Sequence, residues 1–199
     1  SRGVSSPVNN SSVSEDVSKL TNAAIHRNTV SDYISALEKI HVLDDLPAWC
    51  PNLRSKTAIR TTAVRHFSDP AISAYFLDAS AEDLQYDPRT FGLLFESMAV
   101  RDIRVYAQAL DGSVYHYRDG DGLEADAIVH LHNGKWGAFE VKLGAYAIDS
   151  AAENLKKLRG KIDTSREHPP SFLAVITGTE YAYQRKDGVY VIPLACLKN

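Results

Sequence analysis

Cysteine is nearly missing from this sequence, and so is any long apolar run. Among 199 residues the only cysteines are Cys50 and Cys196. Two cysteines exclude a zinc site built from a cysteine cluster, and they do not suggest a disulfide framework. No apolar stretch approaches the length of a membrane span, and no secretory signal is visible at the start. We therefore expect a protein without a membrane anchor in the reducing cytoplasm.

A basic excess is missing as well. The sequence has 22 Lys and Arg against 25 Asp and Glu, which gives a formal net charge of −3. No global positive field then attracts nucleic acid. The G-x-x-x-x-G-K-[ST] loop of ATPases is also missing, so no ATP site is expected within this chain. What the sequence does have is 44% hydrophobic residues, enough for the core of one domain or of two small ones.

The best local signal is a hairpin over residues 119–143. Apolar residues alternate along both arms, so each predicted strand has one apolar face and one face that carries acids. A three-residue loop from His132 to Gly134, with the glycine in the left-handed conformation, aligns the apolar faces. That register sets Asp126 opposite Glu140. A two-residue loop would match polar with apolar faces instead.

Two carboxylates directly opposite each other destabilise a sheet unless something compensates. A divalent cation bound between Asp126 and Glu140 is the simplest way to compensate their repulsion. Lys142 lies two residues after Glu140 on the same face of the strand. The acid on one strand and Glu-x-Lys on the next resemble the motif of the PD-(D/E)XK nuclease superfamily. In that family the two acids bind Mg²⁺ and the lysine orients or polarises the attacking water, and the resemblance implies these roles here. An ordinary solvated hairpin face is the alternative.

Glu96 is the odd residue of the predicted helix before the hairpin. The helix begins at Asp87-Pro88, a cap followed by proline at the first helical position, and continues to about Val105. No basic residue lies one turn from Glu96, although a carboxylate among apolar side chains needs a partner. The nuclease-like family often draws an acid for its metal site from this helix, so the resemblance adds Glu96 to the site. A half-exposed glutamate at the edge of the buried stripe is the alternative.

From residue 87 the predicted order is helix, three strands, helix and strand. This order resembles the α-β-β-β-α-β core of the restriction-endonuclease-like fold, which implies an α/β class with a mixed sheet. The sequence is also similar to a narrower group, the nuclease-like domain of unknown function that follows the ATPase domain in many bacterial and archaeal AAA-type ATPases. The similarity places an ATPase, with its ATP, upstream of Ser1. The segments that carry it are Leu53-Arg54-Ser55-Lys56, Phe67-Ser68-Asp69-Pro70, Gly92-Leu93-Leu94-Phe95-Glu96, Glu124-Ala125-Asp126 and Phe139-Glu140-Val141-Lys142-Leu143.

The chain before residue 87 divides into two predicted parts. Residues 1–19 lack a periodic apolar face and are expected to form a flexible tail. Residues 20–86 contain two helical patterns followed by two extended runs, an order typical of a winged helix, with connecting helices after it. We thus expect three segments, 1–19, 20–86 and the nuclease-like domain 87–199.

Two groups of basic residues are candidates for contact with nucleic acid. The first falls between residues 46 and 68, where no acid occurs, and could follow DNA phosphates. A solvated surface balanced by the acids that follow is the alternative for this group. The second lies on the helix predicted after the hairpin, where charges usually only solvate a helix face. The candidates are Arg54, Lys56, Arg60 and Arg65 in the first group and Lys156 and Lys157 in the second.

Two functions remain open at this point. The first is a DNA endonuclease in which Asp126 and Glu140, together with Glu96, hold Mg²⁺ or Mn²⁺ while Lys142 assists. The second is a catalytically silent module that keeps the nuclease fold, binds DNA or a protein partner and regulates the ATPase. The first rests on analogy of fold.

Overall fold

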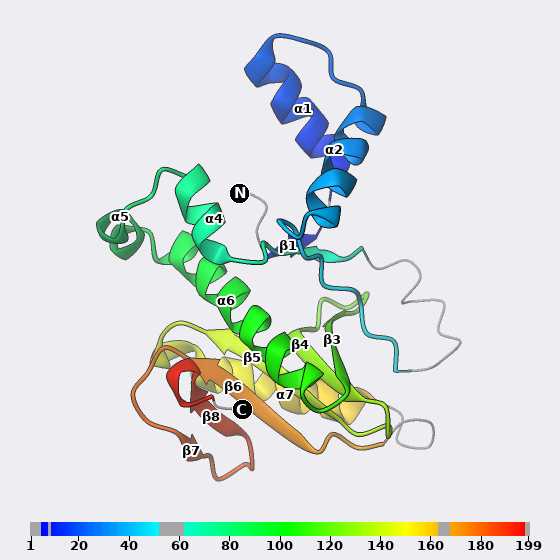
Figure 1. Ribbon diagram of the computed structural model, residues 1–199. Helices are drawn as coiled ribbons and strands as arrows, with labels where there is room; N and C mark the ends of the chain where they lie inside the picture. Colours follow the sequence, from blue (N-terminus) through cyan, green and yellow to red (C-terminus); the bar gives the residue numbers. More distant parts are fainter. Residues whose placement is uncertain (1–4, 8, 52–61, 163–167, 198–199) are drawn as a thin grey trace.

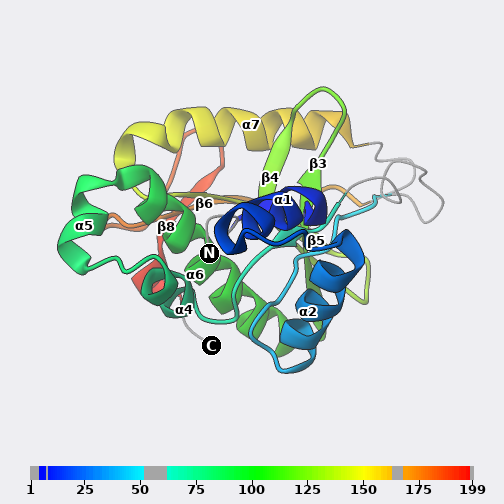
Figure 2. The same cartoon turned by 90° about the horizontal axis from the view of Figure 1, so that it is seen from above.

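The structure is a computed structural model that describes residues 5–7, 9–51, 62–162 and 168–197. It confirms the α/β class: a six-stranded mixed sheet has strand order β3-β4-β5-β6-β8-β7 (Figure 1). Helices α6 and α7 lie on opposite sides of this sheet (Figure 2). The elements are α6 (Pro88–Gln108), β3 (Gly112–Arg118), β4 (Glu124–Leu131), β5 (Trp136–Lys142), η1 (Ala145–Ala147), α7 (Ile148–Lys161), β6 (Phe172–Thr177), β7 (Tyr183–Gln184), β8 (Tyr190–Pro193) and η2 (Leu194–Cys196).

The β4–β5 hairpin has the predicted register. Ala127 of β4 lies opposite Phe139 of β5 in an antiparallel pair. Leu131 donates its backbone N–H to the Lys135 carbonyl at 2.8 Å, which leaves three residues in the loop, and Gly134 has φ +81°. Strand β5 then pairs in parallel with β6, so that it is central in the sheet. A central strand is expected to be apolar throughout, which makes the charged end of β5 an exception.

The sheet is covered on both faces by apolar side chains. One cluster joins α7 to side chains of the strands, among them Trp136 and Ala138 of β5. The other joins α6 to the opposite face, with Phe139 and Val141 of the same strand. The alternation along β5 is therefore the one expected for a strand buried on both faces.

Strand β4 contains an irregularity that the sequence did not predict. Tyr115 of β3 pairs with Ile128, but Tyr117 pairs with Ala125, so β4 has one extra residue in this interval. As a result Ala125 packs in the α7 cluster while Ala127 packs in the α6 cluster, although strict alternation would put both on one face. Asp126 lies within this β-bulge.

The chain before α6 contains four helices and a small two-stranded sheet among its described residues. Where a flexible tail up to residue 19 was expected, helix α1 begins at Asn10. The Asn9 side chain caps it by accepting hydrogen bonds from the Ser11 and Ser12 N–H groups, so a polar cap rather than an apolar stripe defines this helix. The elements are β1 (Ser6–Pro7), α1 (Asn10–Thr21), α2 (Arg27–Lys39), β2 (Val64–Arg65), α4 (Pro70–Phe76) and α5 (Ala81–Tyr86).

Residues 43–49 connect this N-terminal part to the main sheet. Leu46 has no exposed surface and packs in the α6 cluster, while Trp49 packs in the α7 cluster. Trp49 donates its backbone N–H to the His116 carbonyl of β3 at 2.6 Å. Residues 46–49 therefore share a core with the sheet, whereas a separate unit was expected. The buried side chains of α2, Val30 and Ile34, pack instead in a third cluster with Leu43, Phe67 and Leu94 of α6. The winged helix and the domain boundaries stay predictions.

No helix in the described ranges has both the length and the apolar character needed to cross a membrane.

Candidate functional site

Three of the four predicted site residues meet where β4 and β5 separate. Lys142 of β5 places its Nζ 2.6 Å from Glu140 Oε2 and 3.4 Å from Asp126 Oδ2. The regular β4–β5 pairing ends at Ala127, and beyond it Asp126 Oδ2 accepts the Val141 N–H at 2.7 Å. A side chain thus replaces a carbonyl in the ladder, which turns the Asp126 carboxylate toward the end of β5.

Glu96 of α6 belongs to the same group. It is half-buried and, with Asp126 and His116, lines a small cavity of about 100 Å³. Burial raises the pKa of Glu96 well above its usual value, and the negative charge of Asp126 raises it further, while Lys142 opposes the shift. The predicted convergence of Asp126, Glu140, Lys142 and Glu96, called the acidic site below, is therefore present in the structure.

Glu140 is the most deeply buried member, with 2% of its surface exposed. Burial, followed by the negative charge of Asp126, raises the pKa of Glu140 to about 8, although the Lys142 ammonium lowers it. Burial also lowers the pKa of Lys142, but the Asp126 and Glu140 charges outweigh it and raise that pKa above the usual value. Three carboxyl groups and one ammonium therefore share a poorly solvated site, and the raised pKa values of Glu140 and Glu96 limit the negative charge that it carries without a metal.

The shifted pKa of Glu140 makes stability depend on pH. Folded Glu140 holds its proton more tightly than the unfolded chain, where its pKa is 4.5, so its contribution is lost as pH rises through about 8. We expect metal-free protein in EDTA to become less stable to urea between about pH 6.5 and 8. Burial lowers the pKa of His66 from 6.5 to about 4, so this residue makes stability rise with pH. Its effect falls between these two pKa values and therefore below the pH window of the experiment.

Glu140→Gln is the matched variant for this experiment. Its urea midpoint should change less across the same window, because the amide does not titrate. If the urea midpoints of wild type and Glu140→Gln changed equally with pH, the pKa of Glu140 would not be raised in the folded state.

The acidic site contains the kind of ligand atoms that a hard cation prefers. In the described ranges no three His, Cys, Asp or Glu side chains are already arranged to hold a metal ion, and the Lys142 ammonium bridges two of the carboxylates. Carboxylate oxygens are the ligands that Mg²⁺ and Mn²⁺ prefer. Asp126, Glu140 and Glu96 are the residues that would hold such an ion.

The predicted nucleic-acid contacts are only in part within the described residues. Arg65 was expected to be exposed, but its guanidinium bonds both carboxylate oxygens of Asp45, at 2.8 and 3.0 Å, and its side chain is 12% exposed. Arg54, Lys56 and Arg60 lie outside the described ranges. On α7, Lys156 bonds Glu153 and Asp187, whereas Lys157 is exposed.

His116 is a site residue that sequence reasoning missed. It lies on β3 opposite the bulge, lines the small cavity beside Glu96 and Asp126, and is 4% exposed. Its Nε2 has no hydrogen-bond partner among the described residues, and burial lowers the pKa of its imidazole. No local signal marks it, because it reaches the cavity only through the pairing of β3 with β4.

Comparison with known protein families gives two matches. The family described as "Domain of unknown function (DUF4143)" matches residues 91–197. A second family, "Domain of unknown function (DUF8612)", matches residues 1–83. No curated protein and no solved structure matches the chain. The first match covers α7, most of α6 and all four members of the acidic site.

Proposed function

We propose that this chain, which belongs to the DUF4143 family of domains of unknown function, is a metal-dependent endonuclease that hydrolyses phosphodiester bonds in DNA. The observation that carries the proposal is the convergence of the Asp126, Glu140 and Glu96 carboxyl groups around the Lys142 ammonium. Burying several like charges together is costly, and a site that does so is a candidate for catalysis.

The residues of the acidic site have distinct tasks in this proposal. A bound Mg²⁺ or Mn²⁺ would supply a Lewis acid that lowers the pKa of a water molecule and neutralises charge on the phosphate. Asp126 is oriented for metal binding by the Val141 N–H, and Glu140 by the central strand that carries it. Lys142 keeps a positive charge at every physiological pH and stabilises the charge that develops on the phosphate oxygens.

The finer parts of the proposal rest on the sequence resemblance. We infer that residues 87–199 are a nuclease-like domain of the PD-(D/E)XK type, and the observed order α6, β3, β4, β5, α7, β6 supports this. We also infer that an AAA-type ATPase precedes the chain in a cytoplasmic protein, and that DNA is the substrate. Lys157, exposed on α7, is the described candidate for a phosphate contact.

One observation favours a second function. The Lys142 ammonium already neutralises Asp126 and Glu140, so the charges of the acidic site are partly balanced without a metal. A cluster of this kind can be purely structural. The alternative proposal is therefore a silent module that binds DNA or a protein partner and regulates the ATPase.

Cleavage of DNA separates the two functions. The purified chain should convert supercoiled plasmid or single-stranded DNA to shorter products with Mg²⁺ or Mn²⁺, and should not do so with EDTA. The same metals should raise its melting temperature, because they bind the folded site. A chain that binds DNA but never cuts it, even when joined to its upstream ATPase, would support the silent module.

A further inference from the structure

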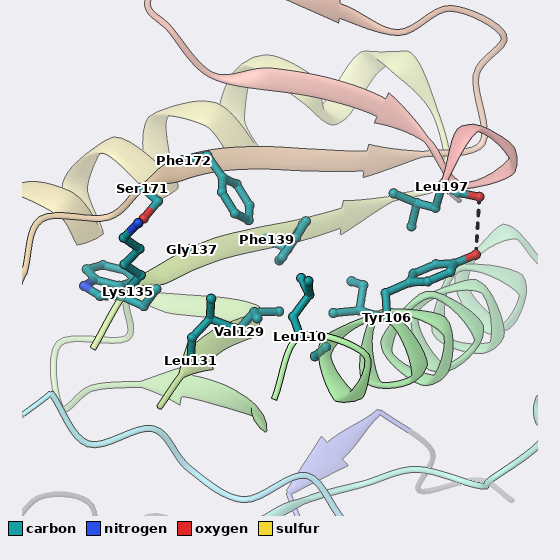
Figure 3. A pocket seen from close by; sticks show the side chains of 13 residues that line it. Tyr106, Leu110, Val129, Leu131, Lys135, Gly137, Phe139, Ser171, Phe172 and Leu197 are labelled. Atoms are coloured by element: carbon teal, nitrogen blue, oxygen red, sulfur yellow. Dashed lines mark hydrogen bonds between the residues drawn. The ribbon is translucent and has the colours of Figure 1, made fainter. Parts of the chain in front are cut away.

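A second and larger cavity lies on the α6 face of the sheet, at the opposite end of the strands from the acidic site. Its volume is about 390 Å³, and it is bounded by the C-terminal half of α6, the end of β4 and the start of β5 (Figure 3). Asp126 lies near the start of β4 and Lys142 at the end of β5, so the two sites share no residue. The cavity is therefore a separate site, and its proposed role does not rest on the proposed nuclease.

Small residues create the cavity. A Cβ atom at Gly137 would lie 2.4 Å from the Phe172 ring, so only glycine lets this ring lie against β5. Phe172 in turn meets Phe139 edge to face, with ring centroids 5.1 Å apart. On α6, Ala107 leaves open the space that a larger side chain would fill. These residues form a concave apolar wall.

The two ends of the cavity differ in chemistry. At one end, the Tyr106 hydroxyl donates a hydrogen bond to the Leu197 carbonyl at 3.3 Å (Figure 3). The side chains of Lys135 and Ser171 lie at the other end. Lys135 is the one charged residue among the described residues that line the cavity, and no described acid forms an ion pair with it. An apolar body with a single negative charge at one end would complement this arrangement.

We propose that this cavity binds a medium-chain carboxylic acid, with the carboxylate at Lys135 and Ser171 and the alkyl chain along the apolar wall. The cavity falls within the roughly 300–1,000 Å³ of typical small-molecule sites, which are mostly apolar with a few polar groups that set orientation. Displacing water from the wall supplies the affinity, and Lys135 supplies the preference for an anion.

Dodecanoate and dodecanol test the proposal, because they share the chain and differ in the head group. Titration calorimetry, below the concentration at which either forms micelles, should show saturable binding of dodecanoate and at least about tenfold weaker binding of dodecanol. Bromododecanoate should reduce the tryptophan fluorescence, since Trp136 borders the cavity, although its ring packs in the α7 cluster on the other face of β5. Absence of dodecanoate binding by the folded protein would overturn the proposal, and equal binding of dodecanol would overturn the assignment of an acid.

Three variants locate the binding. Ala107→Leu fills the cavity and should abolish dodecanoate binding, while Lys135→Gln should weaken dodecanoate about tenfold and leave dodecanol unchanged. Lys186→Gln, a matched loss of charge at the β7–β8 turn, should bind as wild type does. Circular dichroism melts establish that each variant is folded. If the folded Ala107→Leu and Lys135→Gln proteins both bound dodecanoate normally, the ligand would lie elsewhere and the proposal would be wrong.

Discussion

Glu140→Gln should lower the rate of metal-dependent DNA cleavage by at least about a hundredfold while leaving the protein folded. The amide keeps the size of the side chain but removes the negative charge that holds a cation. The melting temperature in EDTA should fall little, because the lost ion pair with Lys142 is offset by the lost repulsion from Asp126. Gel-based cleavage rates, measured beside melting curves with and without Mg²⁺, give both quantities.

Two further variants sharpen this experiment. Lys142→Met should reduce cleavage to a similar extent, since it removes the cation to which the proposal assigns stabilisation of the phosphate charge. Glu82→Gln on exposed α5 should cleave as wild type does. A structural cluster predicts another pattern: Glu140→Gln would leave Lys142 with one partner, lower the melting temperature and change no activity. Full cleavage by the folded Glu140→Gln protein would remove Glu140 from the mechanism.

Leu46→Ala should cost about 2–5 kcal/mol of the free energy of unfolding. Leu46 has no exposed surface and packs against side chains of α6, so the variant leaves a void in the core of the main sheet. Urea unfolding followed by far-ultraviolet circular dichroism should show one transition, shifted as a whole to lower urea. This shift would establish that residues 43–49 stabilise the sheet rather than a separate unit.

Leu20→Ala is the matched control for this second experiment. Leu20 lies in α1 with 83% of its surface exposed, so the same substitution should change the free energy of unfolding by no more than about 0.5 kcal/mol. Two transitions in the Leu46→Ala protein, with only the first one shifted, would instead favour an independent N-terminal domain.

The hairpin and its acids could be predicted because their determinants are local. The alternation of apolar residues on both arms, together with one glycine suited to a left-handed turn, admits a single register, and the structure has it. Glu96 could be marked as a carboxylate that needs an external partner because its own helix offers none, but only the family resemblance assigned it to the site. For the register and for the missing partner alike, a few neighbouring residues contain the information.

The features that escaped prediction depend on pairings between distant parts of the chain. The bulge at Asp126 exists only relative to β3, and the ion pair that occupies Arg65 requires Asp45, twenty residues earlier. Trp49 reaches the main core because its backbone pairs with β3. The sequence pattern of a single segment does not indicate which distant segment it will pair with.

The pairing of residues 47–49 with β3 also determines how the sheet can meet other chains. His116 donates its N–H to the Pro47 carbonyl and accepts the Trp49 N–H, so part of the outer edge of β3 is already hydrogen-bonded within the chain. At the opposite edge, β7 has only two residues. Among the described residues, strand addition, the route by which exposed edges polymerise or capture extended peptides, is therefore blocked at His116 on one edge and offered only a two-residue strand on the other. The contact at His116 and the shortness of β7 both act against edge-to-edge aggregation of the sheet.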